Sequence, residues 1–473
     1  MAKKDTNKTE GKTGKTDIRD TLLYTRKNGY ELVDVEERKA IEDYSLLYMD
    51  YLNNSRTERE CVNNAIALAE EKGFKPFVPG AELKPGDKIY FDNRGKMLIL
   101  AVVGTQSLEN GAVIAGAHVD APRLDLKQNP LYESDELAFF KTHYYGGIKK
   151  YQWVTIPLEL HGVVALKSGE TVDVVIGRDP GDPRFVITDL LPHLAADQMK
   201  KTMSEGIKGE SLNILVGSVP YDDEGKDKVR LAVMSILHES YGIVEEDFLS
   251  AELEAVPAFD VCEIGLDRSL IGGYGHDDRV CAFAELKAIF DVENPARTCV
   301  CILADKEEIG SMGVTGMQSM AFETFMTDIC NATGADVNRC LEKSFCLSAD
   351  VTAATDPNYP DVVEKNNDAR INYGMGICKF TGARGKSGSS DASAEVVAYV
   401  RNVFSENGVI WQLAELGKVD QGSGGTIAQY MANRNIDTID AGVPVLSMHA
   451  PFEVVSKLDC YMTYKGVLAL YND

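Results

Sequence analysis

The stretch Cys299-Val-Cys-Ile-Leu-Ala-Asp305-Lys-Glu307-Glu308 indicates the fold more strongly than any other part of the chain. Its first six residues are apolar or small, which is the length and composition of a buried strand. Acidic residues follow at the point where that strand would end. Three other apolar runs have the same form, because a histidine or an aspartate follows each of them: Val113–Ala117 before His118 and Asp120, Phe345–Ala349 before Asp350, and Val443–Met448 before His449.

A mostly parallel α/β sheet is the fold that these runs predict. From about residue 257 onwards, apolar runs alternate with helical patterns, as they do in chains that build parallel sheets. Ligands of open α/β sheets bind beyond the carboxyl ends of the strands. We therefore expect the histidine and carboxylate side chains to converge at one edge of the sheet. Asp277, in Gly275-His-Asp-Asp-Arg, adds an acidic group in front of an amphipathic helix.

Residues 130–255 differ in composition from the rest of the chain. Short β-like runs such as Val172-Asp-Val-Val-Ile alternate there with clusters of Gly, Asp and Pro, including Gly177-Arg-Asp-Pro-Gly-Asp-Pro. We interpret this region as a separate β-rich insertion. It divides an α/β domain into two parts, residues 17–129 and 256–473.

Helical patterns precede the insertion. One helix is expected from about Val33 to Tyr51, and a second after a capping box made by Ser55 and Glu58. Residues 1–16 are polar, rich in lysine and without an apolar core. We expect them to form a disordered arm, not a secretory signal.

The composition excludes several classes of protein. The chain has 473 residues and a formal charge of −24, which disfavours a nucleic-acid surface or an anionic membrane face. Its longest apolar run, Met97–Val103, is far shorter than the roughly 20 residues of a membrane span. The ten cysteines lack CxxC spacing and several lie in apolar stretches, which indicates reduced, buried thiols. We therefore expect a cytoplasmic protein without nucleic-acid or membrane partners.

The residue types at the predicted strand ends suit two divalent metal ions. Imidazole and carboxylate ligands favour zinc, with manganese and cobalt as alternatives. Two ions about 3.5–4 Å apart need a bridging group, and a carboxylate offers one oxygen to each. Successive side chains of a strand point to opposite sides, so one of Glu307 and Glu308 would face the metals and the other would hold the attacking water. Asp120 points the same way as His118 and is placed to orient its ring.

Each of these features also has an ordinary structural interpretation. Adjacent glutamates are usually solvated, a single histidine is usually satisfied by local hydrogen bonds, and Asp350 is placed to cap a helix. Their joint placement after apolar runs favours a metallohydrolase. Two alternatives to an aminopeptidase stay open, namely a deacylase or carboxypeptidase with the same ligands, and a non-enzymatic scaffold or cargo particle.

At these residues the sequence resembles the aspartyl aminopeptidase and aminopeptidase I family of zinc exopeptidases. The matching motifs extend through most of the chain: Ala115-Gly-Ala-His118-Val-Asp120, His276-Asp277-Asp278-Arg279, Asp305-Lys-Glu307-Glu308, Leu347-Ser-Ala-Asp350, Pro357-Asn-Tyr359, Gly424-Gly-Thr-Ile and Val445-Leu-Ser-Met-His449. The resemblance implies an enzyme that hydrolyses the N-terminal residue of peptides with two divalent metal ions. Zinc is the expected metal, and cobalt and manganese are alternatives.

The resemblance also implies roles for the motif residues. Glu307 would be the general base, and Asp120 would orient His118. Five residues would be metal ligands: His118 and Asp350 for one ion, Glu308 and His449 for the other, and Asp277 as the bridge between them.

The chain departs from the family pattern near the expected substrate. Thr352 stands near the place of a histidine that usually follows Ser-Ala-Asp. Lys379, in Gly376-Ile-Cys-Lys-Phe, matches the family's pocket lysine, and Tyr359 and His193 are the other candidates for substrate contact. The departures argue against a preference for acidic N-terminal residues.

The family fold implies a three-layer α/β/α peptidase domain with a mostly parallel mixed sheet, made from both ends of the chain. A β-rich domain would be inserted after the His-x-Asp segment and would serve oligomerisation. The expected partners are therefore peptide substrates and further copies of the chain, assembled into a tetrahedral dodecamer.

Overall fold

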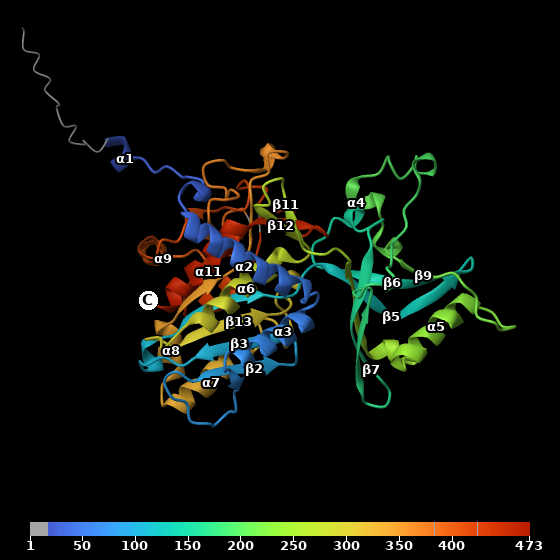
Figure 1. The fold of residues 1–473 in the computed structure, drawn as a ribbon, viewed down its shortest axis with the longest axis horizontal. Coiled ribbons are helices and arrows are strands. Elements are labelled where there is room, and N and C mark those ends of the chain that lie inside the picture. Colours follow the sequence, from blue (N-terminus) through green and yellow to red (C-terminus); the bar gives the residue numbers. More distant parts are fainter. Residues whose placement is uncertain (1–17, 383, 423) are drawn as a thin grey trace, which may run out of the picture.

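The structure is a computed structural model that describes residues 18–382, 384–422 and 424–473. Figure 1 shows an α/β body and, beside it, a smaller sheet formed by the middle of the chain. The predicted disordered arm, residues 1–16, lies outside the described residues.

A nine-stranded mixed sheet forms the centre of the body. Its strand order is β1-β2-β3-β13-β4-β14-β18-β16-β17, and the neighbours β13, β4, β14 and β18 run parallel. Antiparallel β3 and β16 flank this parallel group, so the sheet is mixed, as predicted. The strands are β1 Lys75–Pro76, β2 Lys88–Asn93, β3 Met97–Val102, β4 Val113–His118, β13 Cys299–Ala304, β14 Phe345–Ser348, β16 Met375–Cys378, β17 Trp411–Leu413 and β18 Asp437–Gly442.

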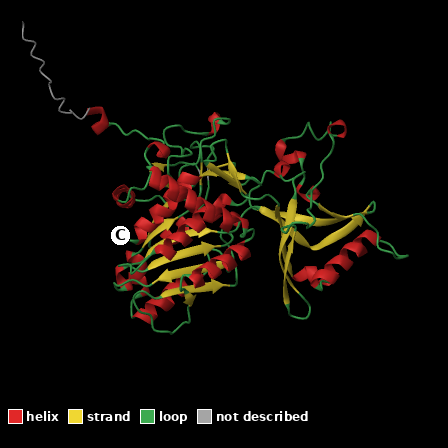
Figure 2. Cartoon of the chain, viewed as in Figure 1, coloured by secondary structure: helices red, strands yellow, loops and turns green. Residues whose placement is uncertain are grey.

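Helices cover both faces of this sheet, which gives three layers (Figure 2). Successive side chains of β13 show the division, because Cys301 belongs to one apolar core and Ile302 to the other. The first core includes residues of α2, α3, α6, α9 and α11, and the second includes residues of α7, α8 and α10. The three-layer α/β/α prediction is confirmed. The helices are α1 Ile18–Leu22, α2 Val35–Asn53, α3 Glu58–Glu71, α4 Met203–Gly206, α5 Lys228–Tyr241, α6 His276–Asp291, α7 Ala321–Thr333, α8 Val337–Lys343, α9 Ala394–Glu406, α10 Ala428–Ala432 and α11 Lys457–Tyr471.

The apolar run Val443–Met448 is not a strand of the nine-stranded sheet, and that expectation was wrong. It supplies β19, Pro444–Leu446, to a separate five-stranded sheet of order β11-β12-β20-β19-β15. The preceding apolar run, β18, occupies the place between β14 and β16 in the large sheet, so β19 pairs with β15 and β20 instead. The other strands of the small sheet are β11 Cys262–Ile264, β12 Leu270–Gly273, β15 Thr352–Ala353 and β20 Glu453–Ser456.

The middle of the chain forms a six-stranded sheet, which we call the inserted sheet. Its order is β8-β7-β10-β5-β6-β9, and every neighbouring pair is antiparallel. It has its own apolar core, which contains the buried Trp153, and α5 packs against it (Figure 1). The division of the chain into domains at residues 130 and 255 stays a prediction. The strands are β5 Arg123–Ser134, β6 Leu137–Tyr145, β7 Leu158–Ala165, β8 Thr171–Ile176, β9 Ile214–Gly217 and β10 Ala251–Pro257.

The capping box of α3 lies two residues later than the sequence analysis places it. The hydroxyl of Thr57 accepts a hydrogen bond from the amide of Glu60, and the Glu60 carboxylate accepts one from the amide of Thr57. The hydroxyl of Ser55 instead accepts a hydrogen bond from the side-chain amide of Asn64. Thr57 is therefore the residue that satisfies the free amides of the first helical turn.

The sequence predicts that the chain has no membrane span and that its cysteines are reduced. Within the described residues, no helix is both long enough and apolar enough to cross a membrane. The ten cysteines are free thiols, and all except Cys262 are buried.

Candidate active site

The carboxyl ends of the parallel strands bring the predicted side chains together. This edge is where ligands bind in open α/β sheets. Five elements contribute the predicted metal ligands: His118 at the end of β4, Glu308 after β13, Asp350 after β14, Asp277 in the first turn of α6 and His449 after β19.

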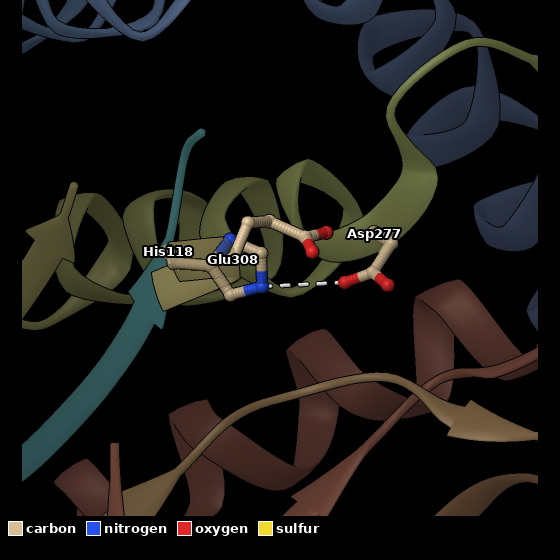
Figure 3. Close-up of side chains that lie close together, drawn as sticks. All are labelled: His118, Asp277 and Glu308. Atoms are coloured by element: carbon tan, nitrogen blue, oxygen red, sulfur yellow. Dashed lines mark ion pairs between the residues drawn. The ribbon is translucent and has the colours of Figure 1, made fainter. Parts of the chain in front are cut away.

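Asp277 lies between the two histidines. Its Oδ1 forms an ion pair with Nε2 of His118 (Figure 3) at 3.2 Å, and its Oδ2 is 3.2 Å from Nε2 of His449. Nε2 of His449 is also 3.4 Å from Oε1 of Glu308. A carboxylate whose two oxygens face different histidines has the arrangement that a ligand shared between two metal ions needs.

Backbone carbonyls fix which nitrogen of each histidine faces Asp277. Nδ1 of His118 donates to the carbonyl of Asp120 over 3.0 Å, and Nδ1 of His449 donates to the carbonyl of Gly147 over 2.8 Å. A carbonyl oxygen only accepts, so Nδ1 carries a hydrogen in both rings. Nε2 is therefore the nitrogen that can bind a metal ion, and such second contacts are typical of metal-binding histidines.

Carboxylates outnumber cationic groups in this site. Burial raises the pKa of Glu307 to about 7 and raises the pKa values of Glu308 and Asp350 well above their usual range. Burial alone would also raise the pKa of Asp277, but hydrogen bonds from the two histidines lower it. Burial alone would lower the pKa of His449, but Asp277 and Glu308 raise it to about 10.

The donor atoms fit divalent metal ions. Ligand atoms of His118, Asp277 and Glu308 lie within 4.8 Å of one another, and so do those of His118, Asp278 and Asp350. Among the described residues, Oε1 of Glu308 is buried without a hydrogen-bond partner. A divalent cation would give that oxygen a partner and would offset the surplus of carboxylates.

Asp120 holds the loop that carries both glutamates. Its Oδ1 accepts a hydrogen bond from the amide of Glu307 over 3.1 Å, and its Oδ2 accepts one from the amide of Glu308 over 3.2 Å. Oδ1 also lies 3.4 Å from Nδ1 of His118. Asp120 thus contacts the predicted base and two predicted ligands at once.

The sequence analysis missed Glu453, which supports the other side of the site. Its carboxylate accepts hydrogen bonds from the amide of Asp277 over 3.1 Å and from the amide of His449 over 2.7 Å. Glu453 is buried in β20, and burial raises its pKa to about 8. The sequence feature that could have indicated Glu453 is its position as an acidic residue directly before the apolar Val454-Val455.

A cavity of about 350 Å³ opens over the predicted ligands. Among the described residues that line it, those other than the predicted ligands and Glu307 are neutral. They include Thr352, Cys378, Phe380, Leu416 and Met448.

The three predicted substrate residues lie outside this cavity. Lys379 forms an ion pair with Asp391 at 2.5 Å. Tyr359 is exposed and borders a neighbouring cavity of about 720 Å³. His193 is exposed in a short helical turn, Pro192–Leu194, that belongs to the middle of the chain.

Histidine and carboxylate donors gathered at the carboxyl edge of an α/β/α sheet define a metallohydrolase. A family model described as aminopeptidase I zinc metalloprotease (M18) matches residues 51–471. The chain belongs to this M18 family of zinc metallo-aminopeptidases. It is therefore an enzyme, and the predicted family is confirmed.

Relatives resemble the chain over nearly its whole length. A probable M18 family aminopeptidase 1 from Clostridium acetobutylicum is 49% identical and covers 96% of this chain and 99% of its own. The crystal structure of an M18 aminopeptidase from Thermotoga maritima is 44% identical, with a TM-score of 0.91 over 95% of this chain and 100% of its own. The mApe1 dodecamer from S. cerevisiae shares the fold at 22% identity, with a TM-score of 0.74 over 90% of this chain and 96% of its own.

Proposed function

We propose that the enzyme removes the N-terminal residue of peptides with two divalent metal ions, for which zinc is the first candidate. His118 and Asp350 would hold one ion, Glu308 and His449 the other, and Asp277 would bridge them. The observation that carries the proposal is the position of Asp277, with one oxygen directed at each histidine. When bound, the ions would polarise the scissile carbonyl and lower the pKa of a shared water.

Glu307 is the proposed general base. Its carboxylate borders the same cavity as the ligands, and its Oε2 lies 3.9 Å from Nε2 of His118, farther than Oδ1 of Asp277 at 3.2 Å. It would take a proton from the attacking water and pass it to the leaving amine. Asp120 would keep Glu307 in place through the hydrogen bond to its amide.

The variant Glu307→Gln tests this role. Turnover should fall by about 10²- to 10⁴-fold, because a Gln cannot accept the proton. Metal content, measured by mass spectrometry of the purified enzyme, should stay that of the wild type. Near-normal turnover, or loss of both metals, would contradict the assignment.

Neutral N-terminal residues are the proposed substrates. Thr352, Phe380 and Met448 border the cavity over the ligands, whereas Lys379 is paired with Asp391. An acidic side chain would find no free cation there among the described residues, and burying it unpaired is costly. A panel of Leu, Met, Asp, Glu and Lys fluorogenic substrates, assayed with zinc, cobalt and manganese, should give the highest kcat/KM for Leu or Met.

Family membership favours this activity over the deacylase, carboxypeptidase and scaffold alternatives. A peptide with a blocked N-terminus separates the first two from an aminopeptidase. N-acetylation of a good substrate should stop its hydrolysis, because the free amine would no longer be available for recognition. Continued cleavage would instead favour a deacylase or a carboxypeptidase.

We further propose a homo-oligomer, a tetrahedral dodecamer assembled through the domain of residues 130–255, in the cytoplasm. The dodecameric yeast structure with the same fold supports the stoichiometry. Exposed apolar side chains at Leu190, Leu194 and Met199 provide a surface suited to contact between copies. Free cysteines agree with a reducing compartment. Light scattering during size-exclusion chromatography would test the mass.

A further inference from the structure

The end of β6 in the inserted sheet contacts the site at two points. The hydroxyl of Tyr145 donates a hydrogen bond to Oδ2 of Asp120 over 2.8 Å. Two residues later, the carbonyl of Gly147 accepts the hydrogen bond from Nδ1 of His449. The body and the inserted sheet lie side by side (Figure 1) and have separate cores. Ion pairs at α3 also join them, but these two contacts join them at the site.

Tyr145 acts on a carboxylate that already organises the site. Asp120 is fully buried, and its oxygens accept from the amides of Glu307 and Glu308. Without the hydroxyl, Oδ2 of Asp120 would lose one of its two donors in a place that bulk water does not reach. Loss of a donor to a buried carboxylate weakens the position of every group bound to it.

The position of the Tyr145 hydroxyl is itself fixed from the inserted sheet. The guanidinium of Arg123, in β5, lies 3.8 Å from the centre of the Tyr145 ring. Arg123 is held in turn by Glu254 of β10 at 3.2 Å and by Glu58 of α3 at 3.5 Å. The ring is only 8% exposed, so it has little freedom to turn away.

We propose that Tyr145 is a positioning residue through which the inserted sheet sets the geometry of the metal site. This inference rests on the proposed function, because it takes His118 and Glu308 as ligands and Glu307 as the base. Tyr145 does not touch the substrate or the metals. It orients Asp120, and Asp120 orients the loop of Glu307 and Glu308 and the ring of His118.

The variant Tyr145→Phe removes the hydroxyl and keeps the ring on Arg123. Tyr144→Phe is the matched control, because Tyr144 is adjacent in β6, is 41% exposed and, among the described residues, has no side-chain hydrogen bond to the site. Zinc affinity, measured by competition with a chelating dye, should fall about 10- to 100-fold in Tyr145→Phe, the range typical of groups behind metal ligands. Tyr144→Phe should bind zinc like the wild type.

Two further measurements separate positioning from folding. In zinc-saturated Tyr145→Phe, kcat should fall while KM for a Leu substrate stays within about twofold, because the lost contact lies behind the base. The melting temperature of the zinc-depleted variant should lie only a few degrees below that of Tyr144→Phe, which is the cost of one lost hydrogen bond to a buried carboxylate. Unchanged zinc affinity would overturn the inference, and so would a loss of stability without zinc that accounts for the weaker binding.

The two proposals fail in different ways. If Tyr145→Phe behaves like the wild type while wild-type enzyme binds zinc and Glu307→Gln is inactive, only the positioning role is lost. If Glu307→Gln retains turnover, the proposed function itself fails.

Discussion

The active site and the junction between α3 and the inserted sheet both bury several charged side chains, but they balance the charges differently. At the junction, Arg123 and Lys96 contact Glu58, and each also contacts a carboxylate of β10. In the active site, two histidines face six carboxylates: Asp120, Asp277, Asp278, Glu307, Glu308 and Asp350.

The same burial has opposite outcomes for Glu58 of the junction and Glu308 of the site. Burial alone would raise the pKa of Glu58, but Arg123 and Lys96 hold it at about 2. Glu308 has no arginine or lysine beside it in the described chain, and burial raises its pKa. Glu58 is neutralised by side chains of the protein itself and serves stability, whereas the site needs an added cation.

Glu308→Gln should have the largest effect on function and the smallest cost in stability. Loss of the proposed ligand oxygen should lower kcat/KM on the order of 1,000-fold, which corresponds to about 4 kcal/mol. The zinc-depleted protein should be at least as stable as the wild type, because Gln replaces a carboxylate that burial already disfavours. Zinc content and thermal unfolding after dialysis against a chelator would check both. A large loss of stability without zinc would break the comparison.

Glu58→Gln is the matched change at the junction. It should lower the free energy of unfolding by roughly 3 kcal/mol, because it leaves the buried Arg123 and Lys96 short of a partner. Denaturant unfolding of the zinc-loaded protein measures this loss. Zinc content per folded chain should stay normal. A stability equal to that of the wild type would show that the junction is not balanced by ion pairing.

Glu285 extends the comparison to a buried carboxylate with neither cation nor metal. Both oxygens lack a hydrogen-bond partner among the described residues, and burial raises its pKa well above 4.5, with Asp278 adding to the effect. A group whose pKa is raised by folding favours the folded state at low pH, and this contribution is lost as the pH rises above the unfolded value. The loss is about 1.4 kcal/mol per pH unit until the group ionises in the folded protein.

Glu285→Gln should therefore remove part of the wild-type loss of stability between pH 5 and higher values. The variant and the wild type should be similar in stability near pH 5, and the variant should be the more stable of the two at pH 8. Denaturant unfolding at both values measures the difference. Parallel pH dependence in the two proteins would show that Glu285 does not contribute.

The surface pair of Lys39 and Asp43 in α2 should have the smallest effect on the free energy of unfolding. The charged groups are 3.9 Å apart, and their side chains are 79% and 64% exposed. Lys39→Ala should change the free energy of unfolding by less than about 0.5 kcal/mol, because water screens an exposed pair. A loss of stability as large as that of Glu58→Gln would mean that burial does not explain the difference between this exposed ion pair and the buried pairs of Glu58.

Most of the α/β body could be predicted from the sequence, because its information is local. Buried strands such as Cys299–Ala304 are short apolar runs, and the chemistry-bearing residues stand directly after them. The boundaries were less accurate. The capping box of α3 is formed by Thr57 and not by Ser55, because both residues can cap a helix and they lie two positions apart. The run Val443–Met448 forms part of the five-stranded sheet, because two adjacent apolar runs can each form a strand and the sequence does not show which sheet each one joins.

The motifs in the amino-acid sequence were enough to predict the family, the three-layer fold and the set of side chains that meet at the sheet edge. Three contacts became visible only in the folded chain: Glu453 with two loops, Tyr145 with Asp120, and Lys379 with Asp391. The reason is the distance along the chain over which each kind of information acts. Apolar periodicity can be seen in consecutive residues, but the hydrogen bond from Tyr145 to Asp120 joins residues 25 positions apart and exists only after β5 and β6 have paired.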